Sequence, residues 1–433
     1  MSMFKEKIIK STLILMIGGL ITKLLGMFIR IITTRTIGIE GMGIYMLIVP
    51  TFSLFMTLSQ LSFPVSISKL VSEDKHNNKR LVFSTIPLSL FVNFLLMIVL
   101  FIIAKPIAIY LLKDERCYLP ILSIALVLPF DSLSNLLRGY FFGKEKMFPH
   151  VISHISEQII RLSLIIITIP KLLKINLIYA VSFIVLVNLI SEALSIFILF
   201  LFLPKNFTLK KSDFKPSKSN LKDVLAISIP TTGSRLIGNI GMFLEPIILT
   251  FSLSYVGFTT SYIQSEYASI TGYVLPIILL PGFFTGAISS AILPGMSKDY
   301  VNNNVLNLKK KLKLGCLFSL LVGIPFTIIL LLFSKELLQI FYHTTLGNNY
   351  LKILSFFFIL YYLEAPFSAC LQATNKSKRI MLDNLYGMLA KNLSILILPF
   401  FNLGIYSIII GNILNVSIIT IRHLKEIKRT LKE

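Results

Sequence analysis

The sequence predicts an all-α membrane protein with about twelve membrane-spanning helices in two six-helix halves. Two observations carry this prediction. Of the 433 residues, 55% are hydrophobic and only 14% are charged, against roughly 25% charged residues in soluble domains. The apolar residues also fall in runs of about 20, the length that lets a helix cross the hydrocarbon core of a bilayer. A water-soluble globular fold is excluded, because this composition cannot supply its polar surface.

Hydropathy places the spans in order along the chain, each as an apolar run between polar connections. They are expected at 11–32, 43–63, 81–104, 119–137, 148–170, 176–203, 224–251, 263–290, 314–333, 353–373, 382–401 and 404–421. The first run follows a basic start, as in a signal peptide, but Lys23 and Arg30 interrupt it and no small-residue cleavage motif follows. We therefore expect it to be retained as the first helix.

The basic residues are distributed unevenly between the two sides of the predicted membrane. Of the 42 Lys and Arg residues, 29 lie in the termini and the even-numbered connections, and 8 lie in the odd-numbered connections. Because cytoplasmic segments carry the excess of Lys and Arg, we expect both termini in the cytoplasm. The net charge of +22 has the same origin, so nucleic acid is not an expected partner.

The longest polar connection, 204–220, follows the sixth span and divides the chain. We expect an N-terminal six-helix lobe at 1–203, a cytoplasmic linker at 204–223, and a C-terminal six-helix lobe with a basic tail at 224–433. The halves share short strings, since Tyr45-Met-Leu precedes PVSISK as Tyr273-Val-Leu precedes LPGMSK. Six spans return the chain to the same side, so the halves would be parallel repeats, as in transporters built from two bundles.

Charged residues inside the spans are the candidate site residues, because a charge in hydrocarbon needs a partner or a wet cavity. In the first span, Lys23 and Arg30 share one helical face, although Arg30 could instead extend to the outer interface. In the fifth span, Glu157 and Arg161 have the i, i+4 spacing of an ion pair. That pair is either part of a site or purely structural.

The seventh and eleventh spans supply the remaining candidates. Arg235 and Asn239 share a face of the seventh span, and Lys391 lies near the middle of the eleventh. With Lys23, Arg30 and Arg161, they are the predicted substrate-binding residues. Glu245, on another face of the seventh span, is expected to pair across helices.

The fourth span carries Asp131 in a short stripe with Asn135 and Arg138, of which Arg138 is expected to reach the cytoplasmic edge. Asp131, Glu157 and Glu245 are predicted to couple transport to an ion or to form ion pairs. Other single acids in the spans are as consistent with a structural role as with a functional one: Glu192, Glu266 and Glu364.

Several classes of chemistry find no support. The sequence has no GxxxxGK[ST] loop and no carboxylate pair or Ser/His/Asp set, so no catalytic residues are assigned and an enzyme is not expected. The three cysteines and five histidines lack the spacing of a zinc site, and no metal or cofactor is expected. Cations on the first helix favour an anionic substrate over a cationic drug.

Four strings resemble the family of stage V sporulation protein B. They are LITKLLGMFIRIITTRTIGIEGMGIYMLIVPTFSLFMTLSQLSFPVSISKLVSE at 20–73, LRGYFFGKEKMFPHVISHISEQIIRL at 137–162, SIPTTGSRLIGNIGMFLEPI at 228–247 and ITGYVLPIILLPGFFTGAISSAILPGMSK at 270–298. That family belongs to the multidrug, oligosaccharidyl-lipid and polysaccharide exporter superfamily. The resemblance implies two six-helix lobes in a V and transport by alternating access. It places Lys23, Arg30, Arg161 and Arg235 around a central cavity.

The resemblance also implies a function. It indicates a flippase of the bacterial cell membrane that carries a polyprenyl-diphosphate-linked saccharide from the cytoplasmic to the outer leaflet during spore cortex formation. Its partners would be that saccharide, membrane lipids and cell-wall synthesis proteins. Two alternatives stay open: a cation-coupled drug or metabolite antiporter on the same scaffold, and a non-transporting scaffold of a sporulation complex.

Overall fold

The computed structural model describes residues 2–73, 77–204, 213, 215 and 217–431, and every regular element in these ranges is a helix. The chain forms two compact units, Met1–Phe243 and Leu244–Glu433. The first unit contains α1 Ser2–Gln60, α2 Phe63–Glu73, α3 Asn78–Pro106, η1 Ile107–Leu111, η2 Glu115–Cys117, α4 Tyr118–Gly143, α5 Met147–Leu173, α6 Leu177–Leu201 and most of α7 Lys218–Tyr255.

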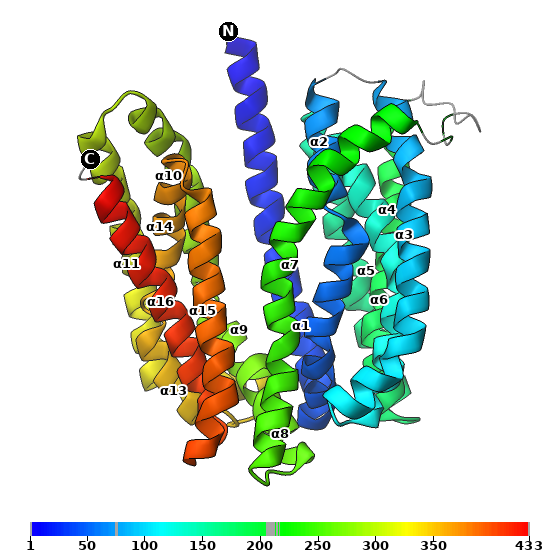
Figure 1. Ribbon diagram of the computed structural model, residues 1–433, viewed down its shortest axis with the longest axis vertical. Helices are drawn as coiled ribbons and strands as arrows, with labels where there is room; N and C mark the ends of the chain where they lie inside the picture. Colours follow the sequence, from blue (N-terminus) through cyan, green and yellow to red (C-terminus); the bar gives the residue numbers. More distant parts are fainter. Residues whose placement is uncertain (1, 74–76, 205–212, 214, 216, 432–433) are drawn as a thin grey trace. The chain divides into compact units, whose positions relative to one another are not determined.

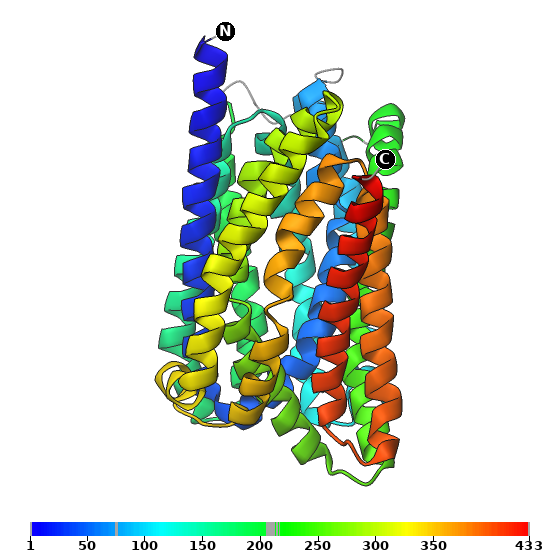
Figure 2. The same ribbon diagram turned by 90° about the vertical axis from the view of Figure 1, so that its left-hand side faces the viewer.

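The second unit begins within α7 and continues through shorter and more frequently broken helices. These are α8 Thr260–Ala268, η4 Ser269–Val274, α9 Leu275–Ile278, α10 Gly282–Val301, α11 Val305–Leu332, α12 Ser334–Tyr342, α13 Asn348–Phe357, α14 Tyr361–Ala373, α15 Ser377–Ile397, η5 Leu398–Phe401 and α16 Tyr406–Thr430. Helices α15 and α16 pack side by side along their length, as Figures 1 and 2 both show.

The boundary between the units lies inside α7, whereas the sequence analysis placed a linker at 204–223. Of that linker, residues 205–212, 214 and 216 lie outside the described residues. The first part of α7 packs within the N-terminal unit through buried hydroxyl groups. Ser228 Oγ donates to Ser66 Oγ at 2.8 Å, and Thr232 Oγ1 donates to Ser62 Oγ at 3.1 Å. These contacts hold the first part of α7 within the N-terminal unit, which ends at Phe243.

Helix α1 contains the first two predicted spans. The apolar helical segment Ile17–Glu73 has 57 residues, which at 1.5 Å per residue is about 85 Å, far more than the ~30 Å hydrocarbon core. Its break is at Gly38, where φ is 66° and ψ is −171°. That conformation is open essentially only to glycine. The chain turns back at this point, as Figure 1 shows for α1.

The described residues contain ten apolar segments that could span a membrane, or eleven if the pair Thr260–Ile278 and Gly282–Val301, bent by 46°, is one span. Since the segment broken at Gly38 covers two predicted spans, these segments account for the twelve expected ones. The eighth span is broken because Pro276 and Pro281 lie within it. The protein is therefore an all-α, multi-pass membrane protein.

Apolar side chains occur both inside and outside each unit. In the N-terminal unit, Phe63, Phe83 and Phe141 of three different helices are fully buried in one core cluster. On α3, however, Phe94 and Ile102 are 59% and 68% exposed. An apolar outer surface of this kind is expected where the surrounding solvent is lipid.

Candidate functional site

A cavity of about 210 Å³ lies within the N-terminal unit, lined by α1, α5 and α6. Two arginines reach it, Arg30 from α1 and Arg161 from α5. The remaining lining residues are uncharged: Gly26, Ile29, Thr33, Met42, Tyr45, Gln158, Ile165, Ile184 and Asn188. Because no acidic residue is among these described lining residues, the cavity is suited to an anion.

Helical spacing places the two arginines on this cavity. Gly26, Arg30 and Thr33 follow one face of α1, and Arg161 and Ile165 follow one face of α5. The close approach of the two helices is made at a different point, because a Cβ on Gly18 would lie 2.3 Å from Val151 Cγ1.

At Gly26, by contrast, an added Cβ would meet no atom within 4 Å. The first helix is therefore packed tightly near Gly18 and leaves open space near Gly26. This difference creates room beside Arg30 while α1 and α5 remain in contact.

Arg161 is held in place by Glu157, one helical turn earlier on α5. Arg161 Nη2 donates to Glu157 Oε1 at 2.6 Å, which confirms the predicted i, i+4 ion pair. The Nε atom of Arg161 is buried and finds no hydrogen-bond acceptor in the described part of the chain. The guanidinium is thus oriented by one carboxylate and keeps donor capacity for a ligand.

Glu157 in turn belongs to a buried charge network on α4, α5 and α6. Arg138 Nη2 donates to Glu157 Oε2 at 2.7 Å, to Glu192 Oε2 at 3.3 Å and to Ser195 Oγ at 2.8 Å. Arg138 is only 3% exposed, so it is buried between helices, and its place at the cytoplasmic edge stays a prediction. Two carboxylates on neighbouring helices compensate the buried guanidinium, and a buried charge needs such partners.

Asp131 is also engaged within the protein. Its Oδ2 atom accepts a hydrogen bond from Gln60 Nε2 at 2.9 Å, and its Oδ1 atom accepts one from Asn135 Nδ2 at 3.0 Å. In the C-terminal unit, Glu245 Oε2 lies 2.8 Å from Lys391 Nζ. This contact confirms that Glu245 pairs across helices, because Lys391 belongs to α15.

The other predicted binding residues of the N-terminal unit are not among the residues that line the arginine cavity. Lys23 is exposed on α1, and Arg235 is exposed on α7. Asn239 joins α7 to α1, since its Oδ1 atom accepts a hydrogen bond from Ser53 Oγ and its Nδ2 atom donates one to Thr57 Oγ1, both at 2.9 Å. The binding roles of these residues stay predictions. Of the cations assigned to the substrate, the structure brings Arg30 and Arg161 to one cavity.

Four polar residues of the cavity were not predicted: Thr33, Tyr45, Gln158 and Asn188. Each carries a weak signal in the sequence, because a polar side chain in a long apolar run is unusual. Asn188 lies one helical turn before Glu192 in the sixth span, and Gln158 follows Glu157. A search for uncharged polar residues on the faces of the charged ones would have found them.

Comparisons with known families and proteins identify relatives over nearly the whole chain. The family model described as polysaccharide biosynthesis protein matches residues 8–299, and the MatE family model matches residues 242–398. Stage V sporulation protein B of Bacillus subtilis (strain 168) is 32% identical, over 99% of this chain and 85% of the relative. Lipid II flippase MurJ of the same organism is 23% identical, over 89% of this chain and 76% of the relative.

Solved structures share the fold. A multidrug resistance MATE family transporter of the MOP superfamily in its inward-facing conformation superposes with a TM-score of 0.77 at 16% identity, covering 95% of this chain and 94% of that one. The outward-facing conformation of a multidrug resistance MATE family transporter gives a TM-score of 0.64 at 17% identity, covering 99% of this chain and 96% of that one. At these identities the likeness concerns the fold alone.

Proposed function

The chain belongs to the family of stage V sporulation protein B, within the polysaccharide biosynthesis proteins, and from this premise we propose its substrate. It is a membrane transporter of the flippase type. The molecule it moves is a polyprenyl-diphosphate-linked saccharide, carried from the cytoplasmic to the outer leaflet for the spore cortex. In this proposal both termini are cytoplasmic, and cell-wall synthesis proteins use the delivered sugar.

The observation that carries the proposal is the cavity lined by Arg30 and Arg161 and by no described acidic residue. A diphosphate presents several oxygen acceptors with negative charge, and guanidinium groups bind such oxygens through paired N–H donors. Because Glu157 orients Arg161 from outside the lining, the arginine is placed before the ligand arrives. The apolar polyprenyl chain can remain in lipid, so only the headgroup needs this polar site.

The membrane potential can drive this transport. Moving about two negative charges outward, away from a negative cytoplasm, is favoured by roughly 4–5 kcal/mol per 100 mV. An ion gradient is therefore not required for net movement. The direction agrees with the expected orientation of the chain, whose basic connections lie on the cytoplasmic side.

The buried acids favour a flippase over a cation-coupled antiporter. Glu157 is shared by Arg138 and Arg161, Glu245 is paired with Lys391, and Asp131 accepts two amide hydrogen bonds. A coupling cation would have to compete with these internal donors.

Reconstitution tests the proposal. Purified protein in liposomes should flip a fluorescent polyprenyl-diphosphate saccharide, and Arg30→Ala or Arg161→Ala should reduce the rate by at least about tenfold, because each removes a charge-assisted contact. Arg35→Ala is the matched control, since Arg35 is an exposed arginine on α1 that does not line the cavity. Flipping at the wild-type rate by both cavity variants would show that the arginine cavity is not the binding site. Absence of flipping by the wild-type protein would refute the proposed transport function.

A further inference from the structure

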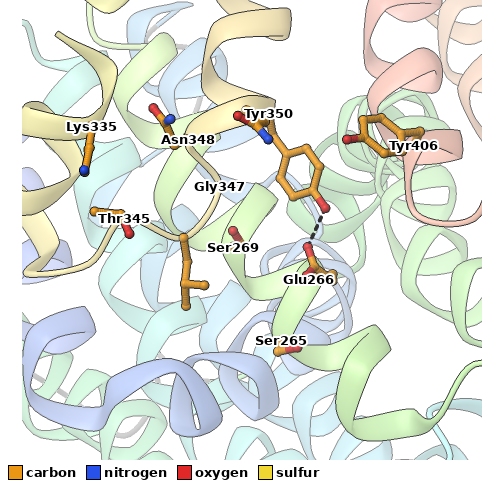
Figure 3. Close-up of a pocket in the computed structure, with 11 residues that line it drawn as sticks. Ser265, Glu266, Ser269, Lys335, Thr345, Gly347, Asn348, Tyr350 and Tyr406 are labelled. Atoms are coloured by element: carbon orange, nitrogen blue, oxygen red, sulfur yellow. Dashed lines mark hydrogen bonds between the residues drawn. The ribbon is translucent and has the colours of Figure 1, made fainter.

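A second pocket, of about 420 Å³, opens within the C-terminal unit (Figure 3). Its walls come from α8, η4, the start of α12, the loop between α12 and α13, the start of α13 and the first residue of α16. This volume lies in the range of roughly 300–1,000 Å³ that is usual for small-molecule sites. The pocket shares no residue with the arginine cavity, and the proposed transport mechanism does not use it.

The backbone around the pocket is built for close packing. Gly347 has φ of 83°, and a Cβ there would lie 2.7 Å from both Ser269 Oγ and Val274 Cγ2. The loop therefore lies directly against η4, a π-helical segment, and such segments occur frequently at functional sites. Ser334 Oγ donates to Asn348 Oδ1 at 2.6 Å and fixes the start of α13. These contacts give the pocket a defined wall without a ligand.

The side chains on the wall combine aromatic rings with hydrogen-bonding groups. Tyr350 Oη donates to Glu266 Oε2 at 2.6 Å, as Figure 3 shows. The rings of Tyr350 and Tyr406 meet edge to face, with centroids 5.7 Å apart at 79°. Tyrosine offers an apolar face and a polar tip in one side chain, which matches a molecule that has both C–H faces and hydroxyl groups.

The side chain of Ser269 independently indicates that the pocket binds a ligand. The residue is 3% exposed, and its Oγ atom makes no hydrogen bond to any described residue. It nevertheless lines the pocket beside Gly347 and Glu266. A buried hydroxyl is normally hydrogen-bonded, so a polar ligand in the pocket would complete this group.

The charges on the wall give no excess of positive charge for an anionic ligand. Glu266 and Lys335 are the acidic and the basic residue among the described lining residues, and their formal charges cancel. The arginine cavity differs in net charge, because its described lining residues include two cations and no acid. The two cavities are therefore suited to different parts of an amphiphilic sugar phosphate.

We infer that this pocket binds a neutral saccharide through Glu266, Ser269, Tyr350 and Tyr406. The ligand is the sugar portion of the transported molecule, and in this respect the inference rests on the proposed function. Tyr406 begins α16, whose 25 residues extend about 37 Å to the C-terminal end of the unit. With the C-terminus in the cytoplasm, the pocket lies at the outer end, where it would receive the sugar after transfer.

The absence of tryptophan allows a direct binding test, because the sequence contains none. A Leu346→Trp variant of the full chain carries a single indole at the pocket, at a lining residue that is not one of the four proposed binding groups. In detergent, its fluorescence should change saturably with chitotriose, a soluble neutral oligosaccharide, and should not change with inorganic pyrophosphate. A Phe197→Trp variant, with its indole on the exposed surface of α6, is the control reporter and should not respond to either compound.

Two substitutions on the reporter background identify the binding groups. Glu266→Gln keeps an acceptor for Tyr350 but removes the charge, and it should weaken chitotriose binding about tenfold, as should Ser269→Ala. Lack of a saturable response up to millimolar chitotriose, an equal response of the control reporter, or an equal affinity for pyrophosphate would overturn the inference.

Two further measurements test whether the bound sugar belongs to the transported molecule, and they distinguish failure of the pocket inference from failure of the transport proposal. The lipid-linked saccharide should displace chitotriose from the reporter, and failure to displace it would overturn the assignment to the transported molecule. Flipping is measured on the wild-type protein in liposomes. If chitotriose binds and flipping is absent, the transport proposal fails; if flipping occurs and chitotriose does not bind, the pocket inference fails.

Discussion

Arg138 and Arg161 hold the two oxygens of one carboxylate, Glu157, at 2.7 and 2.6 Å. Arg138 comes from α4 and is buried, whereas Arg161 reaches the cavity from the same helix as Glu157. Glu157 therefore links Arg138, a buried cation within the helix bundle, to Arg161, a cation that can contact a ligand in the cavity.

Glu157→Gln is expected to destabilise the protein by up to about 3–5 kcal/mol, because it removes the carboxylate that pairs with Arg161 and leaves Arg138 with Glu192, at 3.3 Å. Thermal unfolding of the purified protein in detergent measures this loss. The double variant Glu157→Gln/Arg161→Met should recover part of the stability, since it also removes the guanidinium that paired with Glu157. Equal unfolding temperatures for Glu157→Gln and wild type would show that the pair contributes nothing.

Replacement of each cavity arginine by lysine should separate their roles. Arg161 uses one nitrogen for Glu157, and a lysine at this position cannot hold both the carboxylate and a phosphate oxygen in the same geometry. Arg161→Lys should therefore slow flipping more than Arg30→Lys in the same liposome assay. The opposite order would assign the bidentate contact to Arg30.

Gly38 and Gly26 form a matched pair on α1. Gly38→Ala forces a side chain into a backbone conformation with φ of 66° and should cost about 1–3 kcal/mol of stability. Gly26→Ala meets no atom within 4 Å, so it should leave stability unchanged and narrow the arginine cavity. Unfolding temperature and flipping rate, measured on both variants, check the two effects independently.

The Lys391 and Glu245 pair predicts compensation between two substitutions. Lys391→Met leaves Glu245 largely buried without its cation and should destabilise the protein, and adding Glu245→Gln should restore much of the loss. Unfolding in a double-mutant cycle gives the coupling energy. If flipping remains impaired after stability returns, Lys391 has the predicted role in binding as well.

Orientation can be tested within the C-terminal unit by cysteine labelling of whole cells. Cys117 and Cys370 are buried and Cys316 is partly buried, so all three should first be replaced by serine or alanine. Tyr255→Cys, at a position 75% exposed, should react with a membrane-impermeant reagent. Asn302→Cys, in an exposed connection, should react only with a permeant one. The reverse pattern would place the termini outside.

The sequence could predict features that depend on one helix at a time. The pair Glu157 and Arg161 follows from i, i+4 spacing, and the shared face of Lys23 and Arg30 follows from the helical repeat. The position of Arg138 depends on three helices packing together, so its burial could not be deduced from its place near the end of a hydropathic run.

The second pocket shows a different limit of the sequence. Ser269 and Gly347 are 78 positions apart by their residue numbers, and they meet because Gly347 adopts a left-handed conformation that lets the loop approach η4. Hydropathy identifies such a loop only as a gap between spans. Glu266 was noted as a single acid, but its partner Tyr350 could be found only from the folded chain.

The charge network on α4, α5 and α6 also constrains how the chain enters the membrane during synthesis. A lone charged residue in a span costs free energy on insertion, up to about 2.5–3.5 kcal/mol at the helix centre, and Arg138, near the C-terminal end of α4, lacks its carboxylate partners until α5 and α6 bring Glu157 and Glu192. The three helices are thus most stable in lipid as a group. During synthesis, α4 enters the membrane before α5 and α6. It therefore reaches its final stability only after these two helices have also left the translocation machinery.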